Sequence, residues 1–489
     1  MTARAIMLQG TGSSVGKSTL VAGLCRAARR RGLRVAPFKP QNMSNNAAVC
    51  PGGGEIGRAQ ALQAQAAGVV PHPDLNPVLL KPQSDRSSQV IVHGRAAGHL
   101  RTMDFGARRD LLLNAILASF DRLRSAYDLV IVEGAGSAAE VNLRAGDVAN
   151  MGFAEATDIP VVLVGDIDRG GVIAALVGTQ VVLAEADAGR IVGYLINRFR
   201  GDPRLFDQGL EAIGRVTGWP CFGVVPWFAG AAGLPQEDAT SLEQPEAFRG
   251  TPSATIRIAA PVTSRIANFD DLDPLAAEPR VSVQFIVPGQ PIPRQVDVIA
   301  LLGSKATAAD LAVLRAQGWH HDLYAHVRTG GRVIGICGGF QMLGRSLDDP
   351  LGHDGTPGSF SGLGLLAVTT AMQAEKTVRP AQGYAPAYGA AVAGYEIHTG
   401  DSHGPDCARP MLHLDGRGDG AVSPDGRIAG TYLHGLFNSD AFRHAWLEDI
   451  RTGAGSTHCH AAHVEAILEA LASHIEAHAD IETLLDLAH

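Results

Sequence analysis

The residues best suited to chemistry lie in two short segments far apart in the chain. The first segment, GTGSSVGKS at residues 10–18, follows the apolar run RAIMLQ and precedes an amphipathic stretch. A glycine-rich loop between a strand and a helix can hold phosphate groups with its backbone N–H groups. Lys17 would contact the β and γ phosphate oxygens, and the Ser18 hydroxyl would bind Mg²⁺. This segment therefore predicts an ATP site.

The spacing of this loop departs from the usual GxxxxGK[ST] pattern. That pattern requires glycine at position 11, which is Thr11, whereas the glycines here are Gly10 and Gly12. The Lys-Ser pair at the end of the loop still provides the side chains that contact phosphate and metal. The predicted ATP-binding residues of the loop are Gly10, Gly12, Gly16, Lys17, Ser18 and Thr19.

Two acids are candidates to share Mg²⁺ with Ser18. Glu133 ends the apolar run DLVIVE, so its carboxylate is expected at the carboxyl edge of a parallel sheet, where ligands bind in α/β proteins. Glu55 lies in GGGEIGRAQALQAQAAG, after a glycine turn and at the expected start of a helix. It could bind the metal, or it could be an ordinary first-turn acid that complements the helix dipole. The predicted metal ligands are Ser18, Glu133 and Glu55.

The second segment, RVIGICGGFQML at residues 332–343, places Cys337 between an apolar run and two glycines. This pattern is typical of a strand-turn-helix elbow, in which small neighbours permit a strained backbone and expose a nucleophile. The start of the following helix would supply N–H donors for an oxyanion, chiefly from Gly338. Gly303, in ALLGSKAT at the end of another apolar run, is the expected second donor.

A cysteine nucleophile needs a base. Of the 18 histidines, His434 in GTYLHGLF is favoured because it follows a short strand and precedes a glycine that suits a turn. His398, in GYEIHTG, is the alternative. The sequence therefore predicts a Cys337–His434 pair.

The surrounding pattern predicts the elements that position these residues. Short runs rich in Val and Ile alternate with amphipathic stretches from residue 4 to about 227, and the pattern resumes after residue 254. This alternation predicts two three-layer α/β domains with mainly parallel sheets, in a chain too long for one ordinary core. The predicted parts are a P-loop domain at 1–235, a linker at 236–254, a second domain at 255–450, and a helical extension at 451–489. An apolar stripe marks the extension: Val464, Ile467, Leu468, Leu471 and Ile475.

Composition disfavours several other classes of protein. The net charge is −8 and no basic stripe carries interleaved aromatics, so we expect no nucleic-acid partner. No apolar run approaches the roughly 20 residues of a membrane span, and the N-terminus does not resemble a signal peptide. The six cysteines show neither metal-ligand nor disulfide spacing, so a cytoplasmic protein with reduced thiols is expected. The histidines near Cys459 complete no metal pattern, and we expect them on a solvated helix.

The first half resembles the ATP-dependent, carboxylate-activating domain of the dethiobiotin synthetase type. The resemblance lies in the variant loop, in VEGAG after the buried strand, and in INR at residues 196–198. It implies that Lys17 binds phosphates, that Ser18, Glu133 and Glu55 bind Mg²⁺, and that Asn197 contacts adenine.

The second half resembles the class I glutamine amidotransferase domain. The resemblance implies that Cys337 and His434 hydrolyse glutamine and release ammonia. That family usually has an acid two residues after the histidine, and this position is Leu436 here. A missing acid is typical of the cobyrinic and cobyric acid synthase branch, which implies a catalytic dyad.

Together the two halves resemble the corrin amidases. The segments FKPQNMSNNA, LKPQSD and YLHGLF favour the cobyric acid synthase family over the cobyrinic acid a,c-diamide synthases, which remain the alternative. The resemblance implies that ATP and glutamine are used to amidate carboxylates b, d, e and g of adenosylcobyrinic acid a,c-diamide, with Mg²⁺ and no tightly bound organic cofactor. Asn42 and Asn45 could bond the peripheral amides, or form an Asn-rich turn. A ParA-like ATPase that binds a partner protein is the rival without amidation chemistry.

Overall fold

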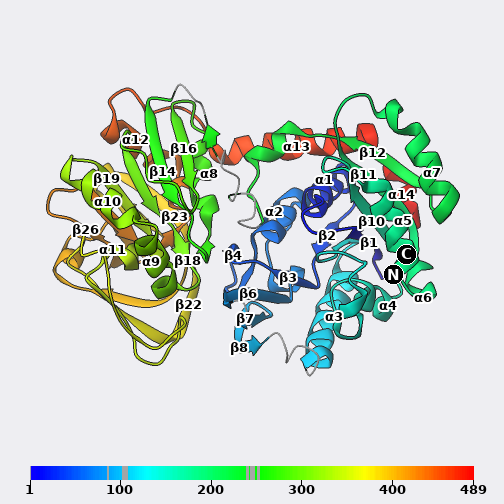
Figure 1. Cartoon of the computed structure of the whole chain (residues 1–489), viewed down its shortest axis with the longest axis horizontal. Helices are drawn as coiled ribbons and strands as arrows, with labels where there is room; N and C mark the ends of the chain where they lie inside the picture. Colours follow the sequence, from blue (N-terminus) through cyan, green and yellow to red (C-terminus); the bar gives the residue numbers. More distant parts are fainter. Residues whose placement is uncertain (1, 85–86, 102–107, 238–241, 243–247, 251–253) are drawn as a thin grey trace.

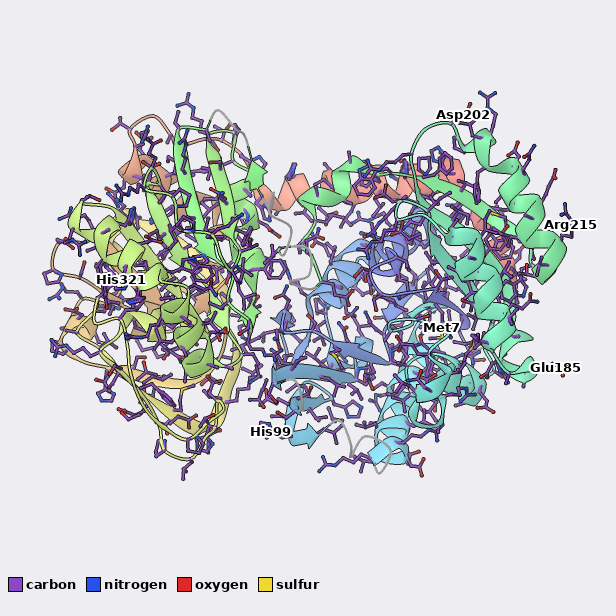
Figure 2. The ribbon with its side chains drawn as sticks, viewed as in Figure 1. Met7, His99, Glu185, Asp202, Arg215 and His321 are labelled. Atoms are coloured by element: carbon purple, nitrogen blue, oxygen red, sulfur yellow. The ribbon has the colours of Figure 1, made fainter. Side chains whose placement is uncertain are left out.

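The computed structural model describes residues 2–84, 87–101, 108–237, 242, 248–250 and 254–489. These residues form two α/β units that face each other (Figure 1). The charged side chains of Glu185, Asp202 and Arg215 lie at the outside of the first unit, whereas Met7 lies inside it (Figure 2). The predicted fold class is confirmed.

The first unit is built on a six-stranded parallel sheet in the order β12-β11-β10-β1-β9-β2. Side chains of its central strand alternate between two apolar cores, because successive residues of a strand face opposite sides. Met7 packs with helices on one face and Leu8 with helices on the other. The strands are β1 (Arg4–Gly10), β2 (Val35–Phe38), β9 (Leu129–Glu133), β10 (Val161–Asp166), β11 (Ile191–Phe199) and β12 (Cys221–Pro226).

Helices cover both faces of this sheet, as the sequence predicts. The face that contains Leu8 packs against α1 (Lys17–Arg30), α2 (Arg58–Ala67) and α13 (His460–His478). The face that contains Met7 packs against α3 (Arg109–Ala126), α4 (Met151–Thr157), α5 (Val172–Val182) and α7 (Asp207–Thr217).

A smaller region follows β2 and lies between the main sheet and the second unit (Figure 1). It contains a four-stranded sheet in the order β3-β6-β7-β8 and the hairpin β4-β5. Ala47, Leu79 and Ile91 of this region pack against Ile397 and Tyr395 of the second unit. Its strands are β3 (Gln41–Met43), β4 (Ala47–Val49), β5 (Glu55–Gly57), β6 (Val78–Ser84), β7 (Ser87–Val92) and β8 (Arg95–Arg101).

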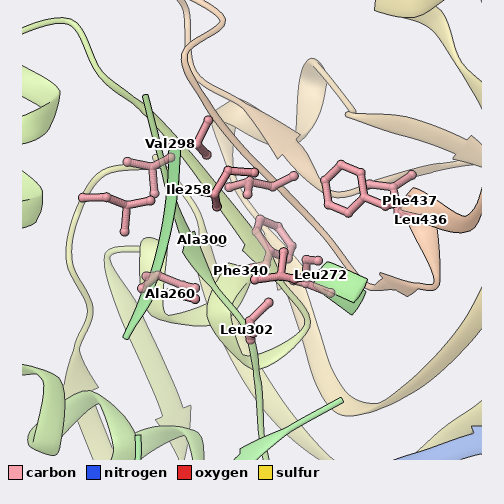
Figure 3. Packing of buried hydrophobic residues seen from close by; sticks show 14 of the residues in the cluster. Ile258, Ala260, Leu272, Val298, Ala300, Leu302, Phe340, Leu436 and Phe437 are labelled. Atoms are coloured by element: carbon pink, nitrogen blue, oxygen red, sulfur yellow. The ribbon is translucent and has the colours of Figure 1, made fainter. Parts of the chain in front are cut away.

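The second unit contains a seven-stranded sheet in the order β13-β16-β14-β17-β19-β27-β26. The five inner strands are parallel, and both edge strands are antiparallel. Phe340 and Phe437 pack with Ile258, Val298 and Ala300 in the core of this unit (Figure 3). The strands are β13 (Phe248–Gly250), β14 (Ile256–Pro261), β16 (Val281–Ile286), β17 (Val298–Leu301), β19 (Arg332–Ile336), β26 (Ala421–Val422) and β27 (Ile428–Thr431).

A second sheet of this unit carries the long hairpin β22 (Thr369–Ala385) and β23 (Ala390–His403), and the short strand β28 (Leu433–His434) pairs with β23. The helices described in this unit are α8 (Asp273–Ala276), α9 (Thr307–Ala316), α10 (Trp319–Arg328), α11 (Gly338–Leu343) and α12 (Asp440–Ile450).

The C-terminal extension returns to the first unit. Helix α13 runs across the top of the view in Figure 1 and packs the predicted apolar stripe against α1, with Ile467 only partly buried. The buried Arg26 of α1 bonds to Glu465 and Glu469 of α13 at 2.8 and 2.7 Å. After α14 (Ile481–Leu487), the His489 carbonyl accepts from the Ala5 N–H at 3.0 Å, so the two ends of the chain meet.

Most of the predicted linker, 236–254, lies outside the described residues. Among the residues described, no helix combines the length and apolar character needed to cross a bilayer. The six cysteines form no disulfide. Within the residues that the structure describes, no group of three or more His, Cys, Asp or Glu side chains is arranged to hold a metal ion by itself.

Candidate active sites

The glycine-rich loop joins β1 to α1, which begins at Lys17. Gly16 has φ 92°, and a side chain there would collide with the Asn197 amide at 2.3 Å, so glycine is required. Lys17 Nζ donates to the carbonyls of Gly12 at 3.1 Å and Gly136 at 2.7 Å. Burial and the neighbouring Lys39 lower the pKa of Lys17 to about 8. Two backbone carbonyls therefore hold the Lys17 ammonium against the loop.

Two carboxylates meet at the start of α1. Ser18 Oγ lies 2.7 Å from Glu133 Oε1 and 2.7 Å from Glu237 Oε2. Lys39 Nζ bridges the same two carboxylates at 2.8 and 2.5 Å, and Gln63 Nε2 donates to the other oxygen of Glu133 at 2.5 Å. Burial lowers the pKa of Lys39, but the two carboxylates outweigh this effect and raise it above its usual range.

This cluster fits a magnesium ion. Mg²⁺ prefers oxygen ligands and commonly uses one or two carboxylates together with substrate phosphates. Ser18, Glu133 and Glu237 offer a hydroxyl and two carboxylates beside the phosphate loop. The Lys39 ammonium between the carboxylates shows that the cluster accommodates positive charge.

The structure places Glu55 apart from Ser18 and Glu133, so its assignment as a metal ligand stays a prediction that the geometry does not favour. Glu55 lies in β5, before helix α2 begins at Arg58, and its side chain is fully buried. Lys81 Nζ bonds one carboxylate oxygen at 2.8 Å, and Lys376 of β22 in the second unit bonds the other. The Glu55 carboxylate therefore bonds two lysines. Glu237, and not Glu55, lies beside Ser18.

A large pocket of about 1050 Å³ opens over the loop. This volume is at the upper end for small-molecule sites, so the pocket has room for more than a nucleotide. Its lining includes Gly16, Lys17, Ser18, Thr19, Lys39, Asn42, Met43, Leu80, Glu133, the segment 135–138, the segment 140–144 and Glu237. Gly10 and Gly12 do not line it.

The predicted asparagine contacts fall in three different places. Asn197 Nδ2 donates to the Val15 carbonyl at 2.8 Å, so this side chain braces the loop, and its contact with adenine stays a prediction. Asn42 lines the large pocket, where its amide donates to Gln60 at 2.8 Å. Asn45 does not line the pocket, and its buried Oδ1 has no hydrogen-bond donor within the described residues.

Cys337 stands at a sharp turn between β19 and α11. Its φ of 52° and ψ of −110° are strained for a residue with a side chain, as expected for a nucleophile elbow. Its Sγ lies 3.4 Å from the Ile397 carbonyl. A side chain on Gly338 would contact the Ser304 backbone nitrogen at 2.8 Å, so the segment 303–304 packs directly against the elbow. The structure therefore brings the predicted nucleophile and both predicted oxyanion segments together.

His434 faces the same pocket as Cys337 and Gly303. Its Nδ1 lies 2.7 Å from Asp271 Oδ2, and the Gly435 N–H donates to Asp271 Oδ1 at 2.6 Å. Both the histidine and the aspartate side chains are 2% exposed. Burial lowers the pKa of His434, but the charges of Asp271 and Cys337 outweigh it and raise the pKa to about 10.

The alternative base, His398, also lines this pocket but is held differently. Its Nδ1 bonds to the Gly400 carbonyl at 2.8 Å, and its ring stacks on Tyr432 with centroids 3.9 Å apart. The nearest acid is Glu396, at 3.6 Å from Nε2. The geometry favours His434, because its ring lies 2.7 Å from a buried carboxylate, whereas His398 lies 3.6 Å from one.

Sequence reasoning missed Asp271, Glu237 and Lys39. Asp271 is 163 residues before His434, in the segment NFDDLDP, and Glu237 lies in the stretch assigned to the linker. Only the folded structure brings these side chains to the two sites. Lys39 carries a weak signal, because it directly follows strand β2 and therefore emerges at the carboxyl edge of the sheet.

Comparisons with known proteins cover both units. Residues 6–241 match the model of the CobQ/CobB/MinD/ParA nucleotide binding domain, and residues 257–442 match the CobB/CobQ-like glutamine amidotransferase domain. A protein of Hyphomonas neptunium named cobyric acid synthase is 62% identical over 488 residues, which cover 100% of this chain and 98% of the relative. Proteins of the same name from Paracoccus denitrificans and Cereibacter sphaeroides are 60% and 59% identical, with 99% of each chain covered. Since this identity spans both units, the chain belongs to the cobyric acid synthase family.

Proposed function

We propose that this chain amidates carboxylates b, d, e and g of adenosylcobyrinic acid a,c-diamide in cobalamin biosynthesis. It acts as an ATP-dependent amide ligase with glutamine as the nitrogen donor. The observation that carries the proposal is that one chain holds an acid cluster (Ser18, Glu133 and Glu237) at a phosphate loop and a cysteine elbow that shares a pocket with a histidine. A ParA-like switch has no use for the second site.

The first site would activate the carboxylate. ATP lies with its phosphates on the loop, where Lys17 and the helix N-terminus offset their charge. Ser18, Glu133 and Glu237 would hold Mg²⁺, which supplies further neutralisation of phosphate charge. A substrate carboxylate oxygen attacks the γ-phosphorus of ATP, and the bond to the β-phosphate oxygen breaks. The products are ADP and an acyl phosphate.

The second site would produce ammonia. His434 accepts the thiol proton of Cys337, and the sulfur attacks the side-chain amide carbon of glutamine. N–H groups of the Gly338 and Gly303 segments stabilise the resulting oxyanion. His434 then protonates the departing nitrogen, and ammonia leaves. Water, deprotonated by His434, hydrolyses the thioester to glutamate and restores the thiol.

Ammonia joins the two half-reactions. It attacks the acyl carbon of the acyl phosphate, phosphate leaves, and an amide remains. Free ammonia is mostly protonated in neutral water, and ammonium is not a nucleophile. Production of ammonia in the same chain as the acyl phosphate therefore favours amide formation over loss to solvent.

The substrate assignment is tested by offering two corrinoids in parallel with ATP, Mg²⁺ and glutamine. Each amidation lowers the mass by about one dalton. We expect four successive steps on adenosylcobyrinic acid a,c-diamide and none on cobyrinic acid. Amidation of cobyrinic acid at two positions, with the a,c-diamide left unchanged, would instead identify the a,c-diamide synthase activity.

A further inference from the structure

The position of the usual third catalytic residue is closed to an acid in this chain. Leu436, two residues after His434, is fully buried in the apolar core of the second unit (Figure 3). An ionised carboxylate there would lie among apolar side chains such as Phe437, at a large desolvation cost. Any group that orients His434 must therefore come from another part of the chain.

We propose that Asp271 is the positioning residue that orients His434 for glutamine hydrolysis, and that the first unit holds Asp271 in place. This inference rests on the proposed role of His434 as the base. Asp271 uses both carboxylate oxygens, one for His434 Nδ1 at 2.7 Å and one for the Gly435 N–H at 2.6 Å. The two bonds fix the plane of the carboxylate, and with it the imidazole. Because Nδ1 donates to Asp271, Nε2 is the nitrogen that can accept the thiol proton.

Residues of the first unit hold the segment that carries Asp271 through two hydrogen bonds and an ion pair. Asn268, with φ 52°, begins the short helical turn Phe269–Leu272. Its backbone N–H donates to Asn46 Oδ1 at 2.7 Å, and its side-chain amide donates to the Ala47 carbonyl at 2.6 Å. The guanidinium of Arg58, at the start of α2, lies 2.7 Å from the carboxylate of Asp270. Asp271 therefore lies on a turn that is bonded to the first unit on one side and to His434 on the other.

The same loop of the first unit also contacts the neighbourhood of the phosphate site. Ser44 Oγ donates to the Glu237 carbonyl at 2.7 Å, and Asn46 Nδ2 donates to the Gln236 carbonyl at 3.3 Å. Glu237 is the carboxylate that reaches Ser18. Residues 44–47 are therefore hydrogen-bonded both to the backbone of residues 236–237, beside the acid cluster, and to the turn behind His434. We expect glutamine hydrolysis to depend on this docking of the two units.

Asp271→Asn tests the positioning role. The asparagine keeps the shape, but it can accept only one of the two bonds, and its NH₂ group favours the wrong tautomer of His434. We expect glutamine-dependent turnover to fall by about 10²–10⁴-fold, as for loss of the orienting acid in a comparable triad, with a much smaller change in the KM for glutamine. Amidation with ammonium should be retained, which would also show that the variant is folded.

The pH profile separates positioning from simple structural support. Among the described residues, Asp271, Asp270, Cys337 and Tyr395 surround His434, and the charged or titratable groups Lys81, Lys305, Asp354, Lys376 and His398 line the same pocket. Of these, Asp271 contributes most to the raised pKa of His434. The alkaline limb of glutamine-dependent kcat/KM reports the loss of the His434 proton, which the departing nitrogen needs. Loss of the Asp271 charge should lower the pKa of His434 and so move this limb to lower pH. Asp271→Glu, which keeps the charge, should retain that limb and recover part of the turnover.

Asn268→Gly tests the docking part, because glycine accepts the positive φ while the bonds of the side chain to Ala47 and Tyr395 are lost. We expect about a tenfold loss of glutamine-dependent turnover, with ammonium-dependent turnover and the alkaline limb unchanged. His434→Ala is measured in the same assay. If it abolishes glutamine use while Asp271→Asn retains wild-type turnover and pH profile, the inference is overturned and the proposed function stands. If His434→Ala retains glutamine use, the base assignment itself fails.

Discussion

Glu55, Lys81 and Lys376 form a buried ion-pair clamp between the two units. The variant Glu55→Gln tests whether Glu55 serves this clamp or binds a metal. The Glu55 carboxylate is fully buried between Lys81 of the first unit and Lys376 of the second. Although burial raises its pKa, the two lysines outweigh this effect and lower it to about 2, against an ordinary value of 4.5. A shift of about 2.5 units corresponds to about 3 kcal/mol of stabilisation. This stabilisation is complete between pH 4.5 and the pKa of Lys376, about 7, and is lost as the pH falls through 2.

The variant would leave two buried ammonium groups without a counter-charge. Removal of one partner from a buried ion pair typically costs about 3–5 kcal/mol, which agrees with the magnitude from the pKa. Burial lowers the pKa of Lys376 to about 7, so this lysine can relieve part of the cost by releasing its proton. We therefore expect a loss of about 3 kcal/mol at pH 7, smaller at pH 9 and larger at pH 6.

Chemical denaturation at these three pH values measures the loss, and magnesium-dependent ATP binding is measured on the same samples. Glu55→Gln should lower stability while leaving nucleotide affinity unchanged. The matched control, Glu237→Gln, should weaken magnesium-dependent ATP binding instead. Unchanged stability in Glu55→Gln, together with a loss of magnesium-dependent binding, would refute the clamp and restore Glu55 as a metal ligand.

Four further variants test individual contacts. His434→Ala should abolish glutamine use and spare ammonium use in the amidation assay, whereas His398→Ala should keep both; the reverse pattern would transfer the base to His398. Lys39→Met should strengthen Mg²⁺ binding without nucleotide, measured by calorimetry, because the two carboxylates lose their internal cation; weaker binding would contradict this. Gly303→Ala places a methyl group 3.1 Å from His434 Cε1 and 2.8 Å from the Ala267 carbonyl. Because both contacts are too close, glutamine turnover should fall at least tenfold. Wild-type turnover would show that the surrounding backbone and side chains shift to make room.

The parts of both sites that depend on local chain geometry could be predicted from the sequence. Lys17 and Ser18 follow a glycine turn into a helix, and Glu133 ends a buried strand, so each position is set by its neighbours in the chain. The Cys337 elbow is local in the same sense, because the glycines around it allow the close packing of α11 on β17. Alternating apolar runs are sufficient to predict two mainly parallel sheets.

The remaining parts depend on which segments meet, and residue patterns carry little information on that. Asp271 and Glu237 reach their sites from segments without periodicity. Glu55 follows the expected glycine turn, but β5 pairs with β4 and directs its carboxylate toward Lys376 of the other unit. The apolar stripe of α13 predicts a buried face but not its partner, which is α1, more than 400 residues earlier in the chain.

In the proposed reaction, Cys337 supplies nitrogen to a ligase site that works independently of it. The most direct measurement is the incorporation of ¹⁵N from amide-labelled glutamine into adenosylcobyrinic acid a,c-diamide, compared between wild type and Cys337→Ala, with and without unlabelled ammonium. We expect labelled amides in wild type, no label in the variant, and full unlabelled amidation of the variant once ammonium is added. Labelled product from Cys337→Ala, or no amidation of that variant with ammonium, would contradict the claim.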